Sequence, residues 1–170
     1  MAILDFLKEK KGRETAEKIT FPASLGAVSK GQYIQMKEIP DEIFSAGVLG
    51  ICCGIEPEEG KVYAPIGGKV SQMADTLHAV GIEAGGMELL IHVGIDTVDM
   101  NGRGFHAAVK EGQIVKKGDL LLEMDLEMIH NEGHPSVVVM AVTNSGDYAS
   151  VEETGSGEIM QGDTVLRVCR

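Results

Sequence analysis

The sequence predicts an all-β fold, an antiparallel β-sandwich or barrel with one or two short helical turns. Short apolar runs alternate along the chain with turns rich in Gly, Pro, Asp and Asn, a pattern typical of strands joined by tight connections. Glycine accounts for 22 of the 170 residues, about twice its average usage. After residue 20, no stretch keeps the helical period of about 3.6 residues over three turns. Aromatic residues make up 4% of the chain and Trp is absent, so the core must consist of Val, Ile, Leu, Met and Ala.

Charge and hydropathy narrow the functional classes. The formal net charge of −11 and the pI near 4.8 argue against a general nucleic-acid binder, which needs a basic face. A basic partner protein suits an acidic chain better. No apolar run reaches the roughly 18 residues that a membrane-spanning helix needs. The first residues also lack the order of charges, apolar stretch and cleavage site that marks a signal peptide. We therefore expect a cytoplasmic protein.

Residues 1–18 differ in composition from the rest and are expected to be a tail before one domain over 19–170. The tail holds five basic and four acidic residues, so its charge is +1 and the domain carries −12. A short amphipathic helix in the tail would present four apolar side chains to an acidic membrane surface. The alternative is a solvated tail. The apolar side chains are Ile3, Leu4, Phe6 and Leu7.

The elements of the domain follow from its apolar runs. Three runs predict strands, at 48–55, 89–93 and 136–142. Two stretches predict one or two helical turns, 105–111 and 125–131, the second ended by Gly133 and Pro135. Residues 112–122 resemble 157–166, and each segment predicts a strand, a Gly-Asp turn and a second strand. The echo indicates either an internal duplication with pseudo-symmetry or the recurrence of a common turn.

His92 is the most informative titratable residue, because it lies in an apolar strand. Strand alternation places it on the face of Leu90, where desolvation disfavours a charged ring. Such an imidazole stays neutral, with one nitrogen free as a nucleophile and the other fixed by an acceptor. Gly94 would let a backbone carbonyl approach the ring. The alternative is a hydrogen-bonded core histidine with no chemical role.

His78 lies across an expected hairpin from His92. Residues 83–88 (EAGGME) predict the turn, and strands folded about it run antiparallel. The two histidines are at similar distances from its centre, which predicts that they are neighbours on one face. Two neutral imidazoles can act together on a phosphoryl group, one as nucleophile and one as hydrogen-bond donor. They can also share a zinc ion, although two histidines are an incomplete zinc site.

The remaining chemistry-bearing residues give weaker signals. His130 and His134 have a metal-binding spacing, but Gly133 and Pro135 interrupt the helix and the order differs from HExxH. His106 is expected at the surface. The cysteines show no paired framework, and we expect them to be reduced and to fill space in the core. They are Cys52, Cys53 and Cys169.

Seven segments, taken together, resemble the IIA component of the glucose family of the bacterial phosphoenolpyruvate-dependent sugar phosphotransferase system. The resemblance runs from about residue 20 to the C-terminus, and its most specific part is the HVGIDTV segment with TLH upstream. The segments are 39–44 (IPDEIF), 61–70 (KVYAPIGGKV), 76–79 (TLHA), 90–98 (LIHVGIDTV), 102–105 (GRGF), 111–113 (EGQ) and 115–119 (VKKGD).

The resemblance implies a flattened antiparallel β-sandwich of the duplicated hybrid type, with two histidines in a shallow apolar depression. By matching position, His92 would accept the phosphoryl group on Nε2 while a backbone carbonyl holds its Nδ1. His78 would stabilise the transferring group, and Thr76 would orient the His78 ring. Gly94 would supply backbone in the histidine loop, and Asp96 would contact a basic residue of a partner.

The resemblance also implies the partners. The phosphoryl donor would be the histidine-containing phosphocarrier protein, and the acceptor a cysteine on the IIB domain of a sugar permease, which the protein would meet transiently at the inner face of the membrane. No cofactor would be required, although a zinc ion could be held by His78, His92 and a partner carboxylate. Regulatory target proteins are a further implied class of partner.

Two alternatives and one departure from the family pattern accompany this interpretation. A zinc metallopeptidase on a related β-sandwich would use the His92–Asp96 spacing, but it also needs a His-x-His pair that the chain lacks. A non-catalytic regulatory module would use the same depression to bind partners.

Aromatic residues that often rim the depression in the family are replaced here, which leaves Phe44 as the main aromatic. The replacing residues are Ala74, Val80 and Leu90.

Overall fold

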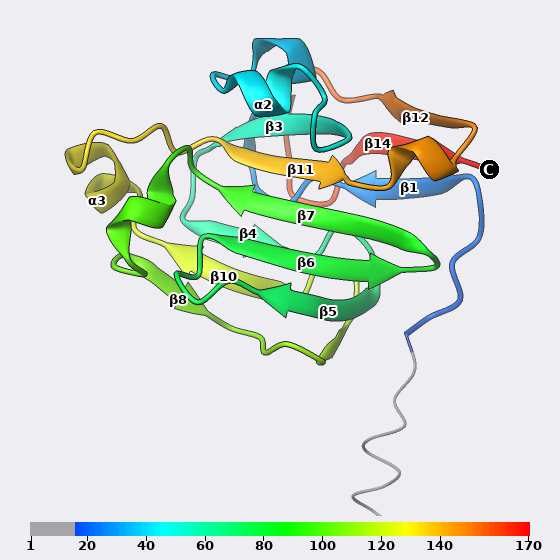
Figure 1. The fold of residues 1–170 in the computed structure, drawn as a ribbon, viewed down its shortest axis with the longest axis horizontal. Coiled ribbons are helices and arrows are strands. Elements are labelled where there is room, and N and C mark those ends of the chain that lie inside the picture. Colours follow the sequence, from blue (N-terminus) through cyan, green and yellow to red (C-terminus); the bar gives the residue numbers. More distant parts are fainter. Residues whose placement is uncertain (1–15) are drawn as a thin grey trace, which may run out of the picture.

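The computed structural model describes residues 16–170, and the described chain folds into three antiparallel sheets (Figure 1). The predicted membrane-contacting helix of the tail lies outside the described residues, apart from 16–18. The large sheet has the order β13 (Glu158–Ile159), β2 (Gly31–Ile34), β3 (Ile51–Pro57), β11 (Val138–Val142), β7 (Met87–Val93), β6 (Ala79–Ala84), β5 (Gly68–Met73) and β9 (Ile114–Val115).

The two small sheets have three strands each. One has the order β1 (Ala23–Gly26), β14 (Thr164–Cys169) and β12 (Ser150–Glu153), and the other β4 (Lys61–Tyr63), β10 (Leu120–Met124) and β8 (Phe105–Ala107). Short helices join the strands: η1 (Met36–Glu38), α2 (Glu42–Ser45), η2 (Thr97–Met100), α3 (Leu126–Asn131) and η3 (Ser145–Asp147). The antiparallel all-β prediction is confirmed, and none of the described sheets closes into a barrel. No helix within residues 16–170 is both long enough and apolar enough to span a bilayer.

The main core lies between the sheets and is aliphatic, as the composition requires. It takes side chains from all three sheets, including Ile82 and Ile91 from the large sheet and Leu122 and Leu166 from the small ones. Each of these four side chains is fully buried. Burial of aliphatic side chains of this kind contributes about 1.5–3 kcal/mol apiece. The core therefore holds the large sheet against the two small sheets without Trp.

The central strands β3 and β11 are buried on both faces. Cys53 and Met140 enter the main core, while their neighbours Cys52 and Val139 enter a second cluster on the opposite face, which also contains Phe44. Figure 1 shows α2 over β3 on that outer side. Burial on both faces explains why β11 is continuously apolar instead of alternating. Both cysteines are free and buried, as predicted.

The sequence echo corresponds to a repeated local structure. In one copy, the Ala64 N–H donates to the Asp119 carbonyl at 2.8 Å and the Gly118 N–H donates to the Ala64 carbonyl at 2.9 Å. In the other copy, Ala27 makes the same two bonds with Asp163 at 2.7 Å and Gly162 at 2.9 Å. Because turn, register and partner strand all repeat, the structure favours duplication over chance recurrence of a common turn.

Two local expectations had different outcomes. The predicted helix near 125–131 is confirmed as α3, which begins after Asp125, whose carboxylate accepts from the Met128 N–H. The prediction of helical turns over 105–111 is wrong, because Phe105–Ala107 form β8 and pair with β10. Long-range pairing of the short apolar segment outweighs its weak local helix preference.

Candidate functional site

The predicted hairpin brings His78 and His92 together. Strands β6 and β7 pair around the Gly85-Gly86 turn, and Ala79 lies opposite His92. The Val93 N–H donates to the His78 carbonyl at 2.7 Å, which extends the ladder past the end of β6. The two imidazole centroids are 5.1 Å apart, and the rings are nearly perpendicular at 79°. Two side chains separated by a strand, a turn and a strand thus form one site.

The loop after β7 fixes the tautomer of His92. Its Nδ1 lies 2.8 Å from the Gly94 carbonyl oxygen. A carbonyl oxygen only accepts, so Nδ1 carries the proton and Nε2 of the neutral ring keeps its lone pair. Gly94 has a φ of +74°, and a Cβ there would collide with the Thr97 side chain. Glycine is therefore required for the carbonyl to point back at the ring.

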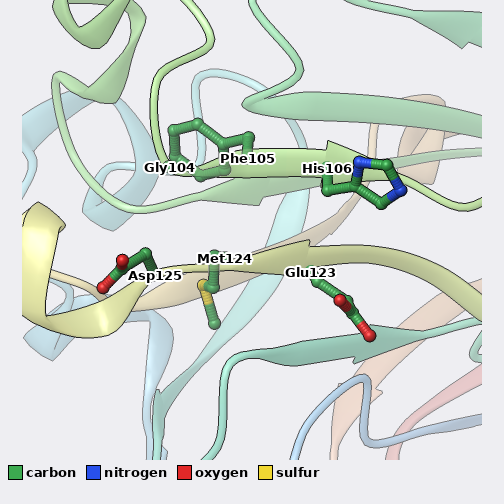
Figure 2. Close-up of a pocket in the computed structure, with 6 residues that line it drawn as sticks. All are labelled: Gly104, Phe105, His106, Glu123, Met124 and Asp125. Carbon is green, nitrogen blue, oxygen red and sulfur yellow. The ribbon is translucent and has the colours of Figure 1, made fainter.

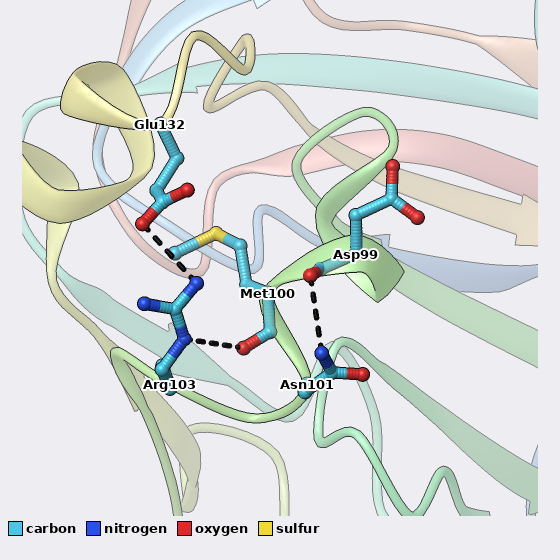
Figure 3. A network of polar contacts seen from close by, with 5 residues as sticks. All are labelled: Asp99, Met100, Asn101, Arg103 and Glu132. Carbon is cyan, nitrogen blue, oxygen red and sulfur yellow. Dashed lines mark hydrogen bonds and ion pairs between the residues drawn. The ribbon is translucent and has the colours of Figure 1, made fainter.

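Thr97 was not singled out from the sequence, although it secures this loop. Its buried hydroxyl donates a hydrogen bond to the Val93 carbonyl. A further contact holds the far end of the loop, where Arg103 donates through Nε to the Met100 carbonyl at 3.2 Å (Figure 3). Arg103 also pairs at 3.2 Å with Glu132, the residue that follows α3. The only sequence signal for Thr97 is its place in the HVGIDTV segment.

Thr76 contacts His78 as the resemblance implied. Its Oγ1 lies 2.5 Å from the His78 Nδ1. The intervening Leu77 has a φ of +58°, which is uncommon for a residue with a side chain and turns the two polar groups toward each other. When the hydroxyl donates to Nδ1, the proton of the neutral His78 ring is on Nε2.

Burial tunes both histidines toward the neutral state. Desolvation lowers the pKa of His78 below its usual value. Desolvation also lowers the pKa of His92, and the neighbouring His78 adds to that effect. The Gly94 carbonyl and the carboxylates of Asp41 and Asp96 act in the opposite direction but are outweighed. The net effect at both rings favours the neutral imidazole, which keeps one N–H.

The second apolar cluster forms the floor of the site. The Phe44 ring meets the His92 ring edge-on, with centroids 5.2 Å apart and an interplanar angle of 61°. Phe44 is placed by α2, where the Asp41 carboxylate accepts from the Ile43 and Phe44 N–H groups. The elements flanking the histidines expose apolar side chains: Ile43 is 53% exposed, Val48 69% and Val98 47%.

The other predicted residues differ in their exposure. Asp96 is exposed, in a left-handed conformation at the start of η2. Ala74 and Leu90 are half-buried. Val80, which was expected at the rim, instead lies in the main core with 1% exposure. Successive side chains of β6 point alternately into the main core and toward the face that carries the site, and Val80 points into the core.

Metal coordination by this chain alone is not supported. Within residues 16–170, no group of three or more His, Cys, Asp or Glu side chains is placed to hold a metal ion. His78 and His92 supply two nitrogen ligands, and a zinc site needs at least one further protein ligand. His130 bonds through Nε2 to the Ser136 hydroxyl at 2.9 Å. The metallopeptidase alternative would therefore need a further ligand beside these two histidines.

A separate hollow of about 460 Å³ lies on the small sheet of β8 and β10 (Figure 2). It is lined by residues 104–106 and 123–125, and His106 pairs with Glu123 across the strands. His106 is exposed, as expected. The hollow includes neither His78 nor His92, so the chemistry described above lies elsewhere on the molecule.

Comparisons with known proteins identify the family of the chain. Residues 23–148 match the family described as phosphoenolpyruvate-dependent sugar phosphotransferase system, EIIA 1. The glucose-specific EIIA component of Staphylococcus epidermidis is 37% identical over 155 residues, which cover 91% of each chain. The β-glucoside-specific EIIBCA component of Dickeya chrysanthemi is 42% identical over 130 residues, 76% of this chain and 21% of the relative. The solved glucose permease IIA of Mycoplasma capricolum superimposes with a TM-score of 0.77 at 33% identity, covering 85% of this chain and 94% of that one.

Proposed function

The chain belongs to the EIIA 1 family of the phosphoenolpyruvate-dependent sugar phosphotransferase system, and from that premise we propose that it carries a phosphoryl group on His92. The donor is the histidine-containing phosphocarrier protein, and the acceptor is a cysteine of the IIB domain of a sugar permease. The observation that carries the proposal is the hydrogen bond from His92 Nδ1 to the Gly94 carbonyl. It leaves one nucleophilic nitrogen in a partly buried, apolar site.

The transfer requires no change of protonation at His92. The Nε2 lone pair forms a bond to phosphorus as the bond between phosphorus and the donor's imidazole nitrogen breaks, and that electron pair returns to the donor. The Nδ1 proton stays on His92, where the Gly94 carbonyl stabilises the positive charge that develops on the ring. In the second step, a cysteine thiolate attacks phosphorus and the electron pair returns to Nε2.

His78 stabilises the group in transit. With the Thr76 hydroxyl donating to Nδ1, the His78 Nε2–H is free to donate to an equatorial phosphoryl oxygen. A donor already aimed at developing negative charge lowers the barrier because it needs no reorganisation during the reaction. The nearly perpendicular rings, with centroids 5.1 Å apart, suit these two roles. Nε2 of His92 would face phosphorus while Nε2 of His78 would face an equatorial oxygen.

The surroundings suit transient docking of a basic partner. The described sequence is strongly acidic, and exposed Asp96 lies beside the histidine loop as a contact for a basic side chain. Long-range attraction speeds encounter, while the exposed apolar side chains of Ile43, Val48 and Val98 lose water on contact. A IIB partner also fits the name of the Dickeya relative, whose longer chain contains a matching segment. The reaction belongs at the cytoplasmic face of the membrane.

The transfer needs no cofactor, because two imidazoles and backbone groups supply the nucleophile and the donors. A zinc ion on His78 and His92 would require a carboxylate from a partner protein, since the described residues complete no site. Such binding would block Nε2 of His92 and compete with phosphorylation. Zinc would therefore act as a regulator of partner binding and not as a participant in the reaction.

Intact-mass spectrometry at neutral to alkaline pH tests the proposal. The protein is incubated with phosphoenolpyruvate, enzyme I and the phosphocarrier protein, beside His92→Ala and the control His106→Ala, which removes an exposed histidine away from the site. We expect one acid-labile phosphoryl group on the native chain and on the control, and none on His92→Ala. No added mass on the native chain, with a carrier that phosphorylates a known acceptor, would favour the non-catalytic regulatory module.

A further inference from the structure

The segment before β11 holds the loop that sets the tautomer of His92. The Gly94 N–H donates to the Val137 carbonyl at 2.9 Å, and the Ile95 N–H donates to the Pro135 carbonyl at 3.0 Å. Gly94 is itself the acceptor for His92 Nδ1. The position of the acceptor carbonyl therefore depends on where residues 135–137 lie.

Ser136 lies between these two supporting carbonyls and is 1% exposed. Its hydroxyl contacts two side chains from different elements, Glu56 of β3 at 2.6 Å and His130 of α3 at 2.9 Å. A hydroxyl has one hydrogen, which here goes to the Glu56 carboxylate, so His130 donates its Nε2–H to the Ser136 oxygen. The buried hydroxyl is thus satisfied on both sides.

The network crosses three neighbouring strands. Strand β11 pairs with β3 on one side and β7 on the other, with Val138 opposite both Ile55 and Val93. Glu56 follows Ile55, and Gly94 follows Val93. Residues 135–137, which lead into β11, are therefore held from both sides. A side-chain hydrogen bond holds them on the β3 side, and backbone hydrogen bonds hold them on the β7 side.

We propose that Ser136 is a positioning residue for His92, held by Glu56 and His130 and acting through the backbone of residues 135–137. It touches neither the phosphoryl group nor the reacting nitrogen. Its effect is to keep the Gly94 carbonyl in line with His92 Nδ1. The effect on reaction rate rests on the proposed phosphoryl transfer, whereas the effect on the imidazole does not.

Variants at Glu56 provide a sharp test, because this residue is exposed and its replacement leaves the core intact. Glu56→Ala removes the acceptor of the Ser136 hydroxyl, and Glu56→Gln keeps an acceptor oxygen. Glu58→Ala is the matched control, since it removes the same charge from an exposed ion pair with Lys30 at 3.5 Å. Ser136→Ala and the double variant with Glu56→Ala complete a mutant cycle.

Two readouts are needed. Nitrogen-15 NMR of the unphosphorylated protein reports the protonation of His92 Nδ1 and the protection of the Gly94 amide from exchange. Steady-state kinetics report kcat and the KM for the phosphocarrier protein. For Glu56→Ala and Ser136→Ala we expect weaker protection of the Gly94 amide, a reduced Nδ1–H population, and a kcat lower by about three- to tenfold with unchanged KM, as loss of one hydrogen bond implies.

Glu56→Gln and Glu58→Ala should match the native chain within about twofold, and the double variant should lose no more than either single variant if both act along one path. Native NMR signals and native kcat in Glu56→Ala and Ser136→Ala would overturn the proposal. A fall in kcat with unchanged His92 and Gly94 signals would also overturn it. If the native chain accepts no phosphoryl group, the proposed function fails, while the NMR comparison still decides whether Ser136 positions the ring.

Discussion

Replacing Gly94 with alanine separates two reasons for which the loop after β7 contains glycine. The φ of +74° costs a residue with a side chain about 1–2 kcal/mol. The new Cβ would also collide with the Thr97 side chain and approach the Pro135 carbonyl oxygen at 3.0 Å, and such overpacking costs about 1–3 kcal/mol. The sum predicts a destabilisation of about 2–5 kcal/mol.

Gly157→Ala isolates the backbone contribution. Gly157 has a φ of +61° and no atom within 4 Å of an added Cβ, so its replacement should cost only about 1–2 kcal/mol. Urea unfolding gives both free energies, and intact-mass spectrometry shows whether His92 still accepts a phosphoryl group. We expect Gly94→Ala to be the less stable variant and to be phosphorylated poorly, because relief of the collision moves the carbonyl away from Nδ1. Equal stabilities with normal phosphorylation would refute the reasoning.

Two further predictions concern the histidines. Thr76→Val removes the hydrogen bond to His78 with little change in shape and should slow phosphoryl transfer about fivefold. Thr76→Ser should stay near the native rate. Equal single-turnover phosphorylation rates for Thr76→Val and the native chain would contradict the role of Thr76. Burial lowers the pKa of His92 from 6.5, so the unfolded chain binds more protons and stability should fall as pH falls below 6.5 toward the lower folded value. Urea midpoints between pH 7.5 and 5 should therefore decline more steeply for the native chain than for His92→Gln, and parallel declines would count against a desolvated ring.

The sequence predicted the histidine pair because both determinants are local. An apolar strand on each side of a Gly-Gly turn fixes a hairpin, and strand periodicity then places His78 and His92 on one face. The short helix α3 was predictable for a similar reason, since a capping Asp125 precedes it and Gly133 follows. Where capping, period and turn chemistry agree, local sequence is sufficient.

The parts that were missed depend on contacts distant in sequence. Residues 105–107 are a strand only because β10 lies beside them, and Val80 is buried because its face of β6 points into the main core. The supports of the histidine loop were invisible for another reason. Backbone carbonyls such as those of Pro135 and Val137 have no side-chain signature, so nothing in the sequence marks them as hydrogen-bond acceptors.

The adjacent cysteines of β3 can report separately on the opening of the two faces of the large sheet. Cys52 faces the cluster under Phe44 and Cys53 faces the main core, and burial raises the pKa of Cys52 to about 12 and that of Cys53 further still. Neither thiol reacts with an alkylating reagent until its own side of the sheet opens. The labelling rate of Cys52 therefore measures how often the floor beneath the histidines opens. The labelling rate of Cys53 measures how often the large sheet separates from the small sheets. Docking of a partner over Phe44 would lower the labelling rate of Cys52 and leave that of Cys53 unchanged.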